Sequence, residues 1–211
     1  MSREPADAEI PQPPERFRKR LEAVAPVLRG QTAERLAGFL AELDAWRRRI
    51  NLTGRLSPDD LVAHALESVP ATSQIPENAR VVDIGSGAGL PAIPLAIFCP
   101  TASFTLIEPT AKKAAFLRHA ARVLALSNLS VRAVRIQDVR GESFDVATTR
   151  GVGSLGAVLG SVAFLEPGGR LLVWTTEPEP LARELSALRL SKAIQIEGTR
   201  SKVVAVFEKP G

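Results

Sequence analysis

The chain contains one cysteine and two histidines among its 211 residues, and it lacks a long uninterrupted apolar run. A single cysteine excludes an internal disulfide framework and a cysteine-rich zinc or iron–sulfur site, and it fits a reducing compartment. Two histidines far apart in the sequence argue against a metal site. No stretch reaches the roughly 18 consecutive apolar residues of a membrane span, and the acidic, proline-containing start is not typical of a signal peptide. We therefore expect a cytoplasmic protein that binds neither a metal nor a membrane.

The composition is that of an ordinary globular protein. Hydrophobic residues make up 45% of the chain and charged residues 24%, which supplies enough apolar material for a core. A length of 211 residues suits one α/β domain with a helical extension and is too short for two catalytic domains. We expect a flexible lead-in over residues 1–14, a helical extension over 15–70, a main domain over 71–211, and a monomer.

Basic residues gather in two places. Between Thr110 and Arg140 there are seven basic residues against one acid, Asp138, and three arginines stand together near the end of an expected helix. Such clusters are often only solvated faces. Two of them in a chain with a pI near 9.7 favour a polyanionic partner, because lysine and arginine replace counterions along a phosphate backbone. The predicted RNA-binding residues are Lys112, Lys113, Arg118, Arg122, Arg47, Arg48 and Arg49.

The first part of the chain has helical patterns. We expect a helix over residues 14–28, and then an amphipathic one whose apolar residues recur at spacings of three and four after a possible N-cap at Thr32. Ser57, Pro58 and Asp60 have the order of an N-cap, a first helical residue and a capping-box acid. They predict a third helix from Pro58 to about Val69, followed by a loop over 70–78.

From Ala79 onward, short β-rich runs alternate with helical ones. This alternation predicts a parallel, doubly wound α/β sheet. Two further runs at the end of the chain resemble an added hairpin, which makes the whole similar to the seven-stranded sheet of methyltransferases. The expected strands lie at 81–85, 103–108, 131–136, 144–149, 170–175, 192–198 and 202–210, and the expected helices lie near 89–98, 110–126, 153–165 and 178–189.

A glycine-rich turn follows the first expected strand. Glycine lets the backbone pass close to a ligand at the mouth of an α/β sheet, although such a turn alone is weak evidence. A dinucleotide fingerprint would need glycine where Leu90 stands, so the spacing disfavours NAD. An acid two residues before the first glycine, here Asp83, is typical of methyltransferases, in which it lies near the methionine moiety. The candidate residues of this segment are Asp83, Gly85, Gly87, Gly89 and Leu90.

Two more positions belong to the expected nucleoside site. Glu108 ends the second expected strand 19 residues after Gly89, where a carboxylate can accept hydrogen bonds from both hydroxyls of a ribose. Gln137 and Asp138 follow the third strand, where a polar pair commonly meets an adenine ring. Turns are polar in any case, so this second signal also has an ordinary explanation.

Five motifs in order resemble the RsmG (GidB) methyltransferases, which methylate N7 of a guanine in bacterial 16S ribosomal RNA. The resemblance runs from about Ala41 to the end of the chain and implies a Rossmann-like class I fold with S-adenosylmethionine as the cofactor. By position it places cofactor contacts at Gly85, Leu90, Glu108, the Ile136–Gln137 pair and Arg150. The motifs are Asn51-Leu52-Thr53, His64 with Ser68, Gly85 to Ile97, Ile107-Glu108 with Lys112-Lys113 and Phe116-Leu117, and Phe144-Asp145-Val146 leading to Arg150.

The chain departs from the family pattern at several positions. It has Ala92 and Gly151 where the family usually has glycine and a small residue such as alanine, and Leu66-Glu67 where the family has leucine-aspartate. The lysine-glycine pair at the end of the fifth strand is replaced by Trp174-Thr175 or its neighbours. The substrate half therefore differs more from the family than the cofactor half does.

The implied reaction needs no general base, since guanine N7 offers an in-plane lone pair and the enzyme has only to align the reacting atoms. Arg150 is the residue expected to position substrate or cofactor, because its planar fork suits a carboxylate or a phosphate. His64 either joins the N-terminal helices to the site or makes an ordinary helix-face contact, and Trp174 either stacks on a base or packs in the core. Two alternative functions stay open: a methyltransferase for a small molecule or a protein, and a ribosome-assembly factor that binds the cofactor with weakened turnover.

Overall fold

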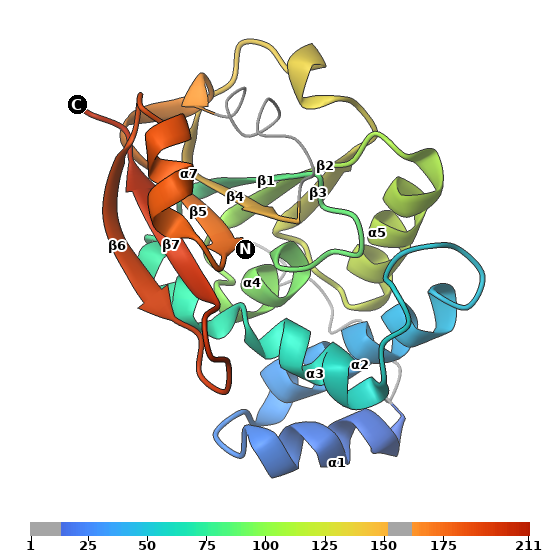
Figure 1. Ribbon diagram of the computed structural model, residues 1–211. Helices are drawn as coiled ribbons and strands as arrows, with labels where there is room; N and C mark the ends of the chain where they lie inside the picture. Colours follow the sequence, from blue (N-terminus) through green and yellow to red (C-terminus); the bar gives the residue numbers. More distant parts are fainter. Residues whose placement is uncertain (1–13, 152–161) are drawn as a thin grey trace, which may run out of the picture.

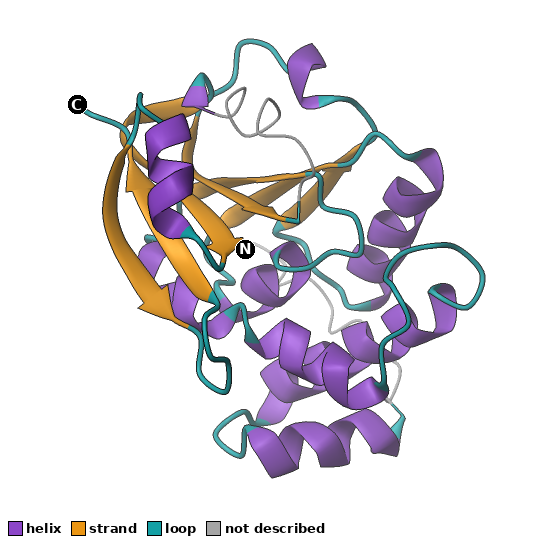
Figure 2. Cartoon of the chain, in the orientation of Figure 1, coloured by secondary structure: helices purple, strands orange, loops and turns teal. Residues whose placement is uncertain are grey.

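A computed structural model describes residues 14–151 and 162–211, and its centre is one seven-stranded sheet (Figure 1, Figure 2). The strand order is β3-β2-β1-β4-β5-β7-β6. Strands β1 to β5 run parallel, and β7 is antiparallel to both of its neighbours. The strands are β1 (Arg80–Ile84), β2 (Ser103–Ile107), β3 (Leu129–Arg132), β4 (Phe144–Arg150), β5 (Leu165–Thr175), β6 (Arg189–Gln195) and β7 (Val203–Glu208). The predicted α/β fold with a mainly parallel seven-stranded sheet is confirmed.

The strand order reverses its direction between β1 and β4. From β1 the chain first moves outward to β2 and β3 and then returns to the other side of β1 with β4. In an open parallel sheet, a ligand binds at the carboxyl ends of the strands where such a reversal leaves a crevice between the connections. The fold by itself therefore points to the ends of β1 and β4, which are Ile84 and Arg150.

Two apolar cores cover the two faces of the sheet. Alternate residues of one strand belong to different cores, as in Val81 and Val82 of β1, because successive side chains of a strand point to opposite faces. The core that includes Val81 also contains α4 (Ala92–Phe98) and α5 (Ala111–Val123). The core on the other face includes Leu185 and Leu188, which follow α7 (Pro178–Glu184).

The N-terminal helices pack on the same face as α4 and α5. They are α1 (Glu15–Val24), α2 (Gly30–Trp46) and α3 (Pro58–Leu66), drawn in blue to cyan at the lower end of Figure 1. Buried residues such as Phe17 and Leu40 share the core that holds Phe116 of α5. The capping box of α3 is present: the Ser57 hydroxyl accepts from the Asp60 amide at 3.1 Å, and the Asp60 carboxylate accepts from the Ser57 amide at 2.7 Å.

Several predicted boundaries in the N-terminal part are wrong. Thr32 is not an N-cap, because α2 already begins at Gly30 and Thr32 lies within its first turn. Helix α3 ends at Leu66, and a 3-10 helix, η1 (Val69–Gln74), replaces the expected loop. Pro70 explains this break, since it has no amide to donate to the Leu66 carbonyl oxygen four residues earlier, and in an α-helix its ring would clash with that carbonyl.

Boundaries in the main domain also shift. Strand β3 ends at Arg132 rather than at Ile136, because its partner β2 ends at Ile107 and offers no further backbone to pair with. Helix α7 ends at Glu184, and the next strand starts earlier than expected, at Arg189. The predicted lead-in over 1–14 lies outside the described residues except for Pro14, and so do residues 153–161 of the predicted helix over 153–165. The predicted end of that helix is wrong, because Leu165 already begins β5.

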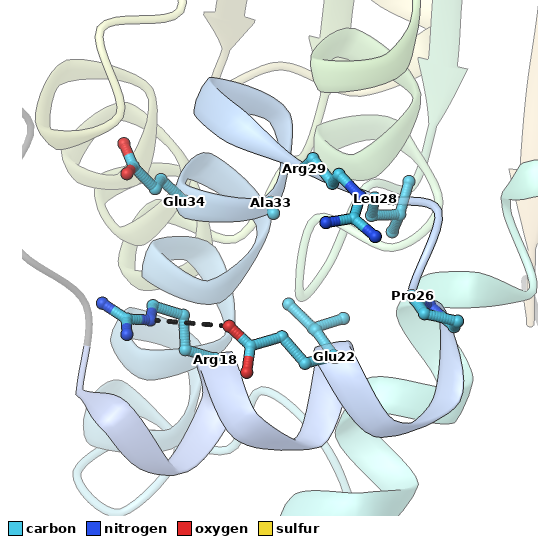
Figure 3. A pocket seen from close by; sticks show the side chains of 8 residues that line it. Arg18, Glu22, Pro26, Leu28, Arg29, Ala33 and Glu34 are labelled. Atoms are coloured by element: carbon cyan, nitrogen blue, oxygen red, sulfur yellow. Dashed lines mark ion pairs between the residues drawn. The ribbon is translucent and has the colours of Figure 1, made fainter.

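A pocket of about 430 Å³ lies between α1 and the start of α2 (Figure 3). Its wall combines apolar side chains with charged ones, including the Arg18–Glu22 ion pair at 3.9 Å. None of the predicted cofactor or RNA residues lines it. Among residues 14–151 and 162–211, no helix is long and apolar enough to cross a membrane, and no group of three or more histidine, cysteine or acidic side chains is arranged to hold a metal ion.

Candidate cofactor and RNA site

The glycine-rich turn connects β1 to α4 at the carboxyl edge of the sheet. Gly85, Gly87 and Gly89 all have positive φ angles, of 71°, 53° and 78°, which other residues rarely adopt. A Cβ atom on Gly89 would lie 2.6 Å from Ile93 Cδ1, so this glycine also permits close packing of the turn against α4. A Cβ atom on Gly87 would meet only the Gly85 carbonyl oxygen, at 3.6 Å. The turn therefore keeps its backbone open to a ligand at Gly87, whereas Gly89 serves packing.

Glu108 is clamped by backbone amides directly after β2. Its Oε2 accepts a hydrogen bond from the Gly87 amide at 2.9 Å, and its Oε1 accepts from the Thr110 amide at 2.8 Å. The residue is 4% exposed, so the two bonds compensate for the loss of water around the charge. Each carboxylate oxygen keeps a second acceptor position. The clamp thus fixes the orientation of the carboxylate that is predicted to meet the ribose.

Asp83 lies in the interior at the end of β1 and is only half satisfied. Its Oδ1 accepts from the Thr148 hydroxyl at 2.6 Å, whereas its Oδ2 is buried with no hydrogen-bond partner among the described residues. Burial raises the pKa of Asp83 to about 6, helped by the charge of Glu108 and opposed chiefly by the hydrogen bond from Thr148. A buried acceptor without a partner is costly and therefore uncommon in a folded protein. A donor on a bound ligand would remove this cost.

The other predicted cofactor residues differ in how deeply they are buried near this corner. Ile136 is buried in the same core as Ile84 and Ile107, which end β1 and β2, so it lies beside the carboxyl edge. Gln137 is exposed within the 3-10 helix η2 (Ile136–Asp138). Leu90 is partly buried and packs on the core below the glycine turn. These positions are compatible with the predicted adenosine contacts, which stay predictions.

Arg150 ends β4 and contacts two residues at the end of α3, His64 and Glu67. Its Nη1 donates to the His64 carbonyl oxygen at 3.1 Å, and its Nη2 lies 3.0 Å from Glu67 Oε2 and also contacts His64 Nδ1. With 19% of the side chain exposed, it is not a plain surface arginine. Burial lowers the pKa of Arg150 and the neighbouring Glu67 opposes this shift. His64 therefore joins α3 to the carboxyl edge of the sheet. This agrees with the first of its two predicted roles, a link between the N-terminal helices and the site.

Trp174 serves packing in this structure. Its indole Nε1 donates to the Glu67 carbonyl oxygen at 2.9 Å, and its ring packs against the core on the α3 side. Of its two predicted roles, the structure supports core packing. Glu67, Thr148 and Lys202 were missed as site neighbours by sequence reasoning. Thr148 carried a usable signal, because it stands two residues before Arg150 and so faces the same side of β4. Glu67 carried another, because it stands where the family has an aspartate.

The two predicted RNA-binding clusters differ in how free their charges are. On α5, Lys112, Arg118 and Arg122 are exposed and Lys113 is partly exposed. At the end of α2, by contrast, Arg47 and Arg48 both bind the buried Asp44 carboxylate, at 2.6 and 2.8 Å. Arg16 completes this cluster at 2.6 Å. With 15% of its side chain exposed, Arg47 presents little charge to RNA, which leaves Arg48 and Arg49 as the accessible members.

The strand order, the glycine turn at the switch point and the paired acids after β1 and β2 define a Rossmann-like S-adenosylmethionine-dependent methyltransferase. Solved methyltransferases share this fold. The structure of TrmN from Thermus thermophilus is 26% identical with a TM-score of 0.54, over 75% of this chain and 50% of that chain. A methyltransferase from Pyrococcus furiosus is 17% identical with a TM-score of 0.60, over 82% of this chain and 96% of that one.

The chain belongs to the GidB family, described as rRNA small subunit methyltransferase G, which matches residues 32–209. A relative of that name from Sorangium cellulosum is 39% identical over 170 residues, which cover 76% of this chain and 71% of the relative. Another, from Halorhodospira halophila, is 37% identical and covers 80% of each chain. The family resemblance and the predicted cofactor, S-adenosylmethionine, are confirmed.

Proposed function

We propose that this chain transfers the methyl group of S-adenosylmethionine to N7 of a guanine in the 16S RNA of the small ribosomal subunit. The observation that carries the proposal is the convergence of the half-satisfied Asp83, the clamped Glu108 and Arg150 at the carboxyl edge of the sheet, in a chain of the rRNA small subunit methyltransferase G family. The exposed basic face of α5 fits an RNA substrate and disfavours a neutral small molecule.

The residues of the site fit the cofactor. Glu108 would hold the ribose, Asp83 Oδ2 would take a donor near the methionine end, and the open backbone at Gly87 would lie against the ligand. When bound, S-adenosylmethionine supplies an electrophilic methyl group. The chain holds both reactants in line and needs no proton acceptor, because N7 of guanine carries a free lone pair. Arg150 orients an anionic group at the mouth of the site through its planar guanidinium.

Methyl transfer to three substrates tests the proposal. Labelled S-adenosylmethionine is offered with naked 16S RNA, with small subunits that lack the modification, and with a protein mixture, and chain cleavage at 7-methylguanine locates the product. We expect label at a guanine of the RNA or of the subunit. Label in the protein mixture would favour the alternative substrate, and cofactor binding without any transfer would favour the assembly-factor alternative, which the Trp174-Thr175 replacement motivates.

Arg150→Lys sharpens this test. Lysine cannot reproduce the two-pronged contact of a guanidinium, so we expect methylation to fall at least about tenfold, or about 1.4 kcal/mol in the transition state. Arg80→Lys is the matched control. Arg80 starts β1 at the opposite edge of the sheet, where it pairs with Glu166 at 3.0 Å. Activity of Arg150→Lys within a factor of about two of the parent would remove Arg150 from the site.

We also propose that the protein acts as a monomer in the cytoplasm, where ribosomes are assembled. Cys99 is partly buried, and burial raises the pKa of its thiol, which fits a thiol that stays reduced. Sedimentation of the purified chain tests the monomer, and fractionation of the source cells tests the compartment.

A further inference from the structure

One buried residue, Glu67, connects four parts of the molecule. Glu67 directly follows α3 and is 6% exposed. Its Oε2 lies 3.0 Å from Arg150 Nη2, and its Oε1 accepts from Lys202 Nζ at 2.8 Å. Its backbone carbonyl oxygen accepts from Trp174 Nε1 at 2.9 Å. A single residue therefore joins α3 to the end of β4, to β5 and to the hairpin between β6 and β7.

The partners of Glu67 lie side by side in the sheet. Arg150 of β4 is in register with Trp174 of β5, and Trp174 is in register with Val204 of β7. Lys202 stands two residues before Val204 and so points to the same face. Thr148, which binds Asp83, stands two residues before Arg150 on that face as well. The Glu67 contacts thus lie two residues further along β4 than the Asp83–Thr148 pair, at the carboxyl edge where the cofactor is proposed to bind.

The cations around Glu67 compensate the charge of its buried carboxylate. Burial alone would raise the pKa of Glu67, but the hydrogen bonds of His64 and Lys202 and the charge of Arg150 lower it to about 2. The carboxylate is therefore ionised throughout the physiological range and is a permanent counter-charge for the guanidinium. His64 Nδ1 lies 3.3 Å from Glu67 Oε2 and also faces Arg150, and with one site for a proton it either accepts from the arginine or donates to the carboxylate.

We propose that Glu67 is the positioning residue that fixes the guanidinium of Arg150 at the mouth of the site and ties its orientation, through Lys202, to the β6–β7 hairpin. An unpaired arginine side chain has many rotamers, and a partner held by the fold removes most of them before substrate arrives. Glu67 itself touches no reactant in this proposal and acts only through Arg150. The proposal rests on the proposed function, since it concerns the residue that is expected to orient the substrate.

The contact is tested first without any activity measurement. In arginine-labelled protein, nitrogen NMR detects hindered rotation of a guanidinium that is held by two partners, and the signals of Arg150 are assigned by their loss in Arg150→Lys. We expect separate, slowly exchanging Nη signals in the parent and their collapse in Glu67→Gln. Signals that persist unchanged in Glu67→Gln would overturn the proposal, whether or not the protein proves to be a methyltransferase.

The kinetic test uses methylation of the small subunit. We expect Glu67→Gln to lower kcat at least tenfold with KM for S-adenosylmethionine within about twofold of the parent, and Glu67→Asp, which keeps the charge, to stay within about threefold. The double variant Glu67→Gln/Arg150→Lys should be no slower than Arg150→Lys alone, because the effect passes through Arg150. Losses that multiply in the double variant would overturn the proposal.

Glu42→Gln is the matched control. Glu42 of α2 makes another side-chain contact between elements, 2.8 Å from His119 Nε2 of α5, and it does not contact Arg150. We expect kcat within about twofold of the parent, and an equal loss in Glu42→Gln and Glu67→Gln would show that the effect is only structural. Should Glu67→Gln fail to fold, Lys202→Met serves instead, with an expected loss of about threefold that disappears in the Arg150→Lys background. A parent that transfers no methyl group refutes the proposed function alone, and the NMR result then decides the positioning role.

Discussion

Two buried carboxylates on one face of the sheet have opposite surroundings. Asp83 is 1% exposed and Glu67 is 6% exposed. The pKa of Asp83 is raised to about 6 by burial, whereas hydrogen bonds and cations outweigh burial and lower the pKa of Glu67 to about 2. Glu67 has ion pairs with Arg150 and Lys202, and Asp83 has one hydroxyl donor on one of its two oxygens.

This difference separates an acid whose charge the protein itself compensates from an acid that is proposed to bind a ligand. The chain itself supplies every counter-charge that Glu67 needs, as it does for Asp44, whose pKa is lowered by three arginines against the effect of burial. For Asp83 Oδ2, the described residues supply no partner. A fold tolerates such a cost where a ligand later compensates for it. The corner around Asp83 thus leaves an acceptor for a ligand, as the proposed cofactor site requires, and the corner around Glu67 is held together by the protein alone.

The largest expected effect is on stability and comes from breaking the ion pairs of Glu67. Glu67→Gln leaves the half-buried guanidinium of Arg150 without its counter-charge, and removal of one partner from a buried pair costs about 3 kcal/mol or more. We expect the free energy of unfolding at pH 7.5 to fall by about that amount, as measured by urea titration. A loss below about 0.5 kcal/mol would mean that the Glu67 network contributes little to the fold.

Asp83→Asn should instead raise the free energy of unfolding, by an amount that depends on pH. Because the pKa of Asp83 is higher in the folded state, its contribution to stability is complete below about pH 4 and is lost as the pH rises through about 6. A shift of about two units corresponds to at most about 3 kcal/mol. The unfolding free energy of Asp83→Asn should therefore exceed that of the parent by a larger amount at pH 7 than at pH 4. A difference that does not change with pH would contradict the raised pKa.

Glu108→Ala tests the cofactor corner directly. It removes charge-assisted hydrogen bonds to the ribose, so we expect the affinity for S-adenosylmethionine or its demethylated product to weaken by about 1–3 kcal/mol in calorimetry. Glu142→Ala is a suitable control, since Glu142 is a partly exposed partner of Arg132. Unchanged affinity in a folded Glu108→Ala protein would show that another carboxylate binds the nucleoside.

The smallest effect per residue is expected on RNA affinity. Replacement of Lys112, Arg118 and Arg122 on α5 by alanine should flatten the plot of log affinity against log salt by about 0.7–0.9 for each lost phosphate contact, with cofactor binding intact. The matched variant replaces Arg48 and Arg49. A parent-like slope in the α5 variant together with a flatter one in the arginine variant would move the RNA interface to the end of α2.

Much of the fold and of the cofactor corner follows from local patterns. Alternation of β-rich and helical runs predicted all seven strands, and the Asp83-to-Gly89 segment marked the glycine turn, because a glycine turn after a buried strand is a local feature of the chain. Boundaries failed where a partner decides the end of an element. Residues after Arg132 have β propensity but lack a neighbouring strand, which no local pattern records.

The sequence by itself thus determined the class of fold, the glycine turn and the acid after β2. Only the tertiary structure decided which charges are free. Three adjacent arginines look alike in the sequence, yet Asp44 binds Arg47 and Arg48, and Glu67 reaches Lys202 across 135 residues of chain. The reason is physical: a pairing between distant residues depends on how strands align and which helix covers their edge, and its energy depends on burial, which exists only in the folded chain.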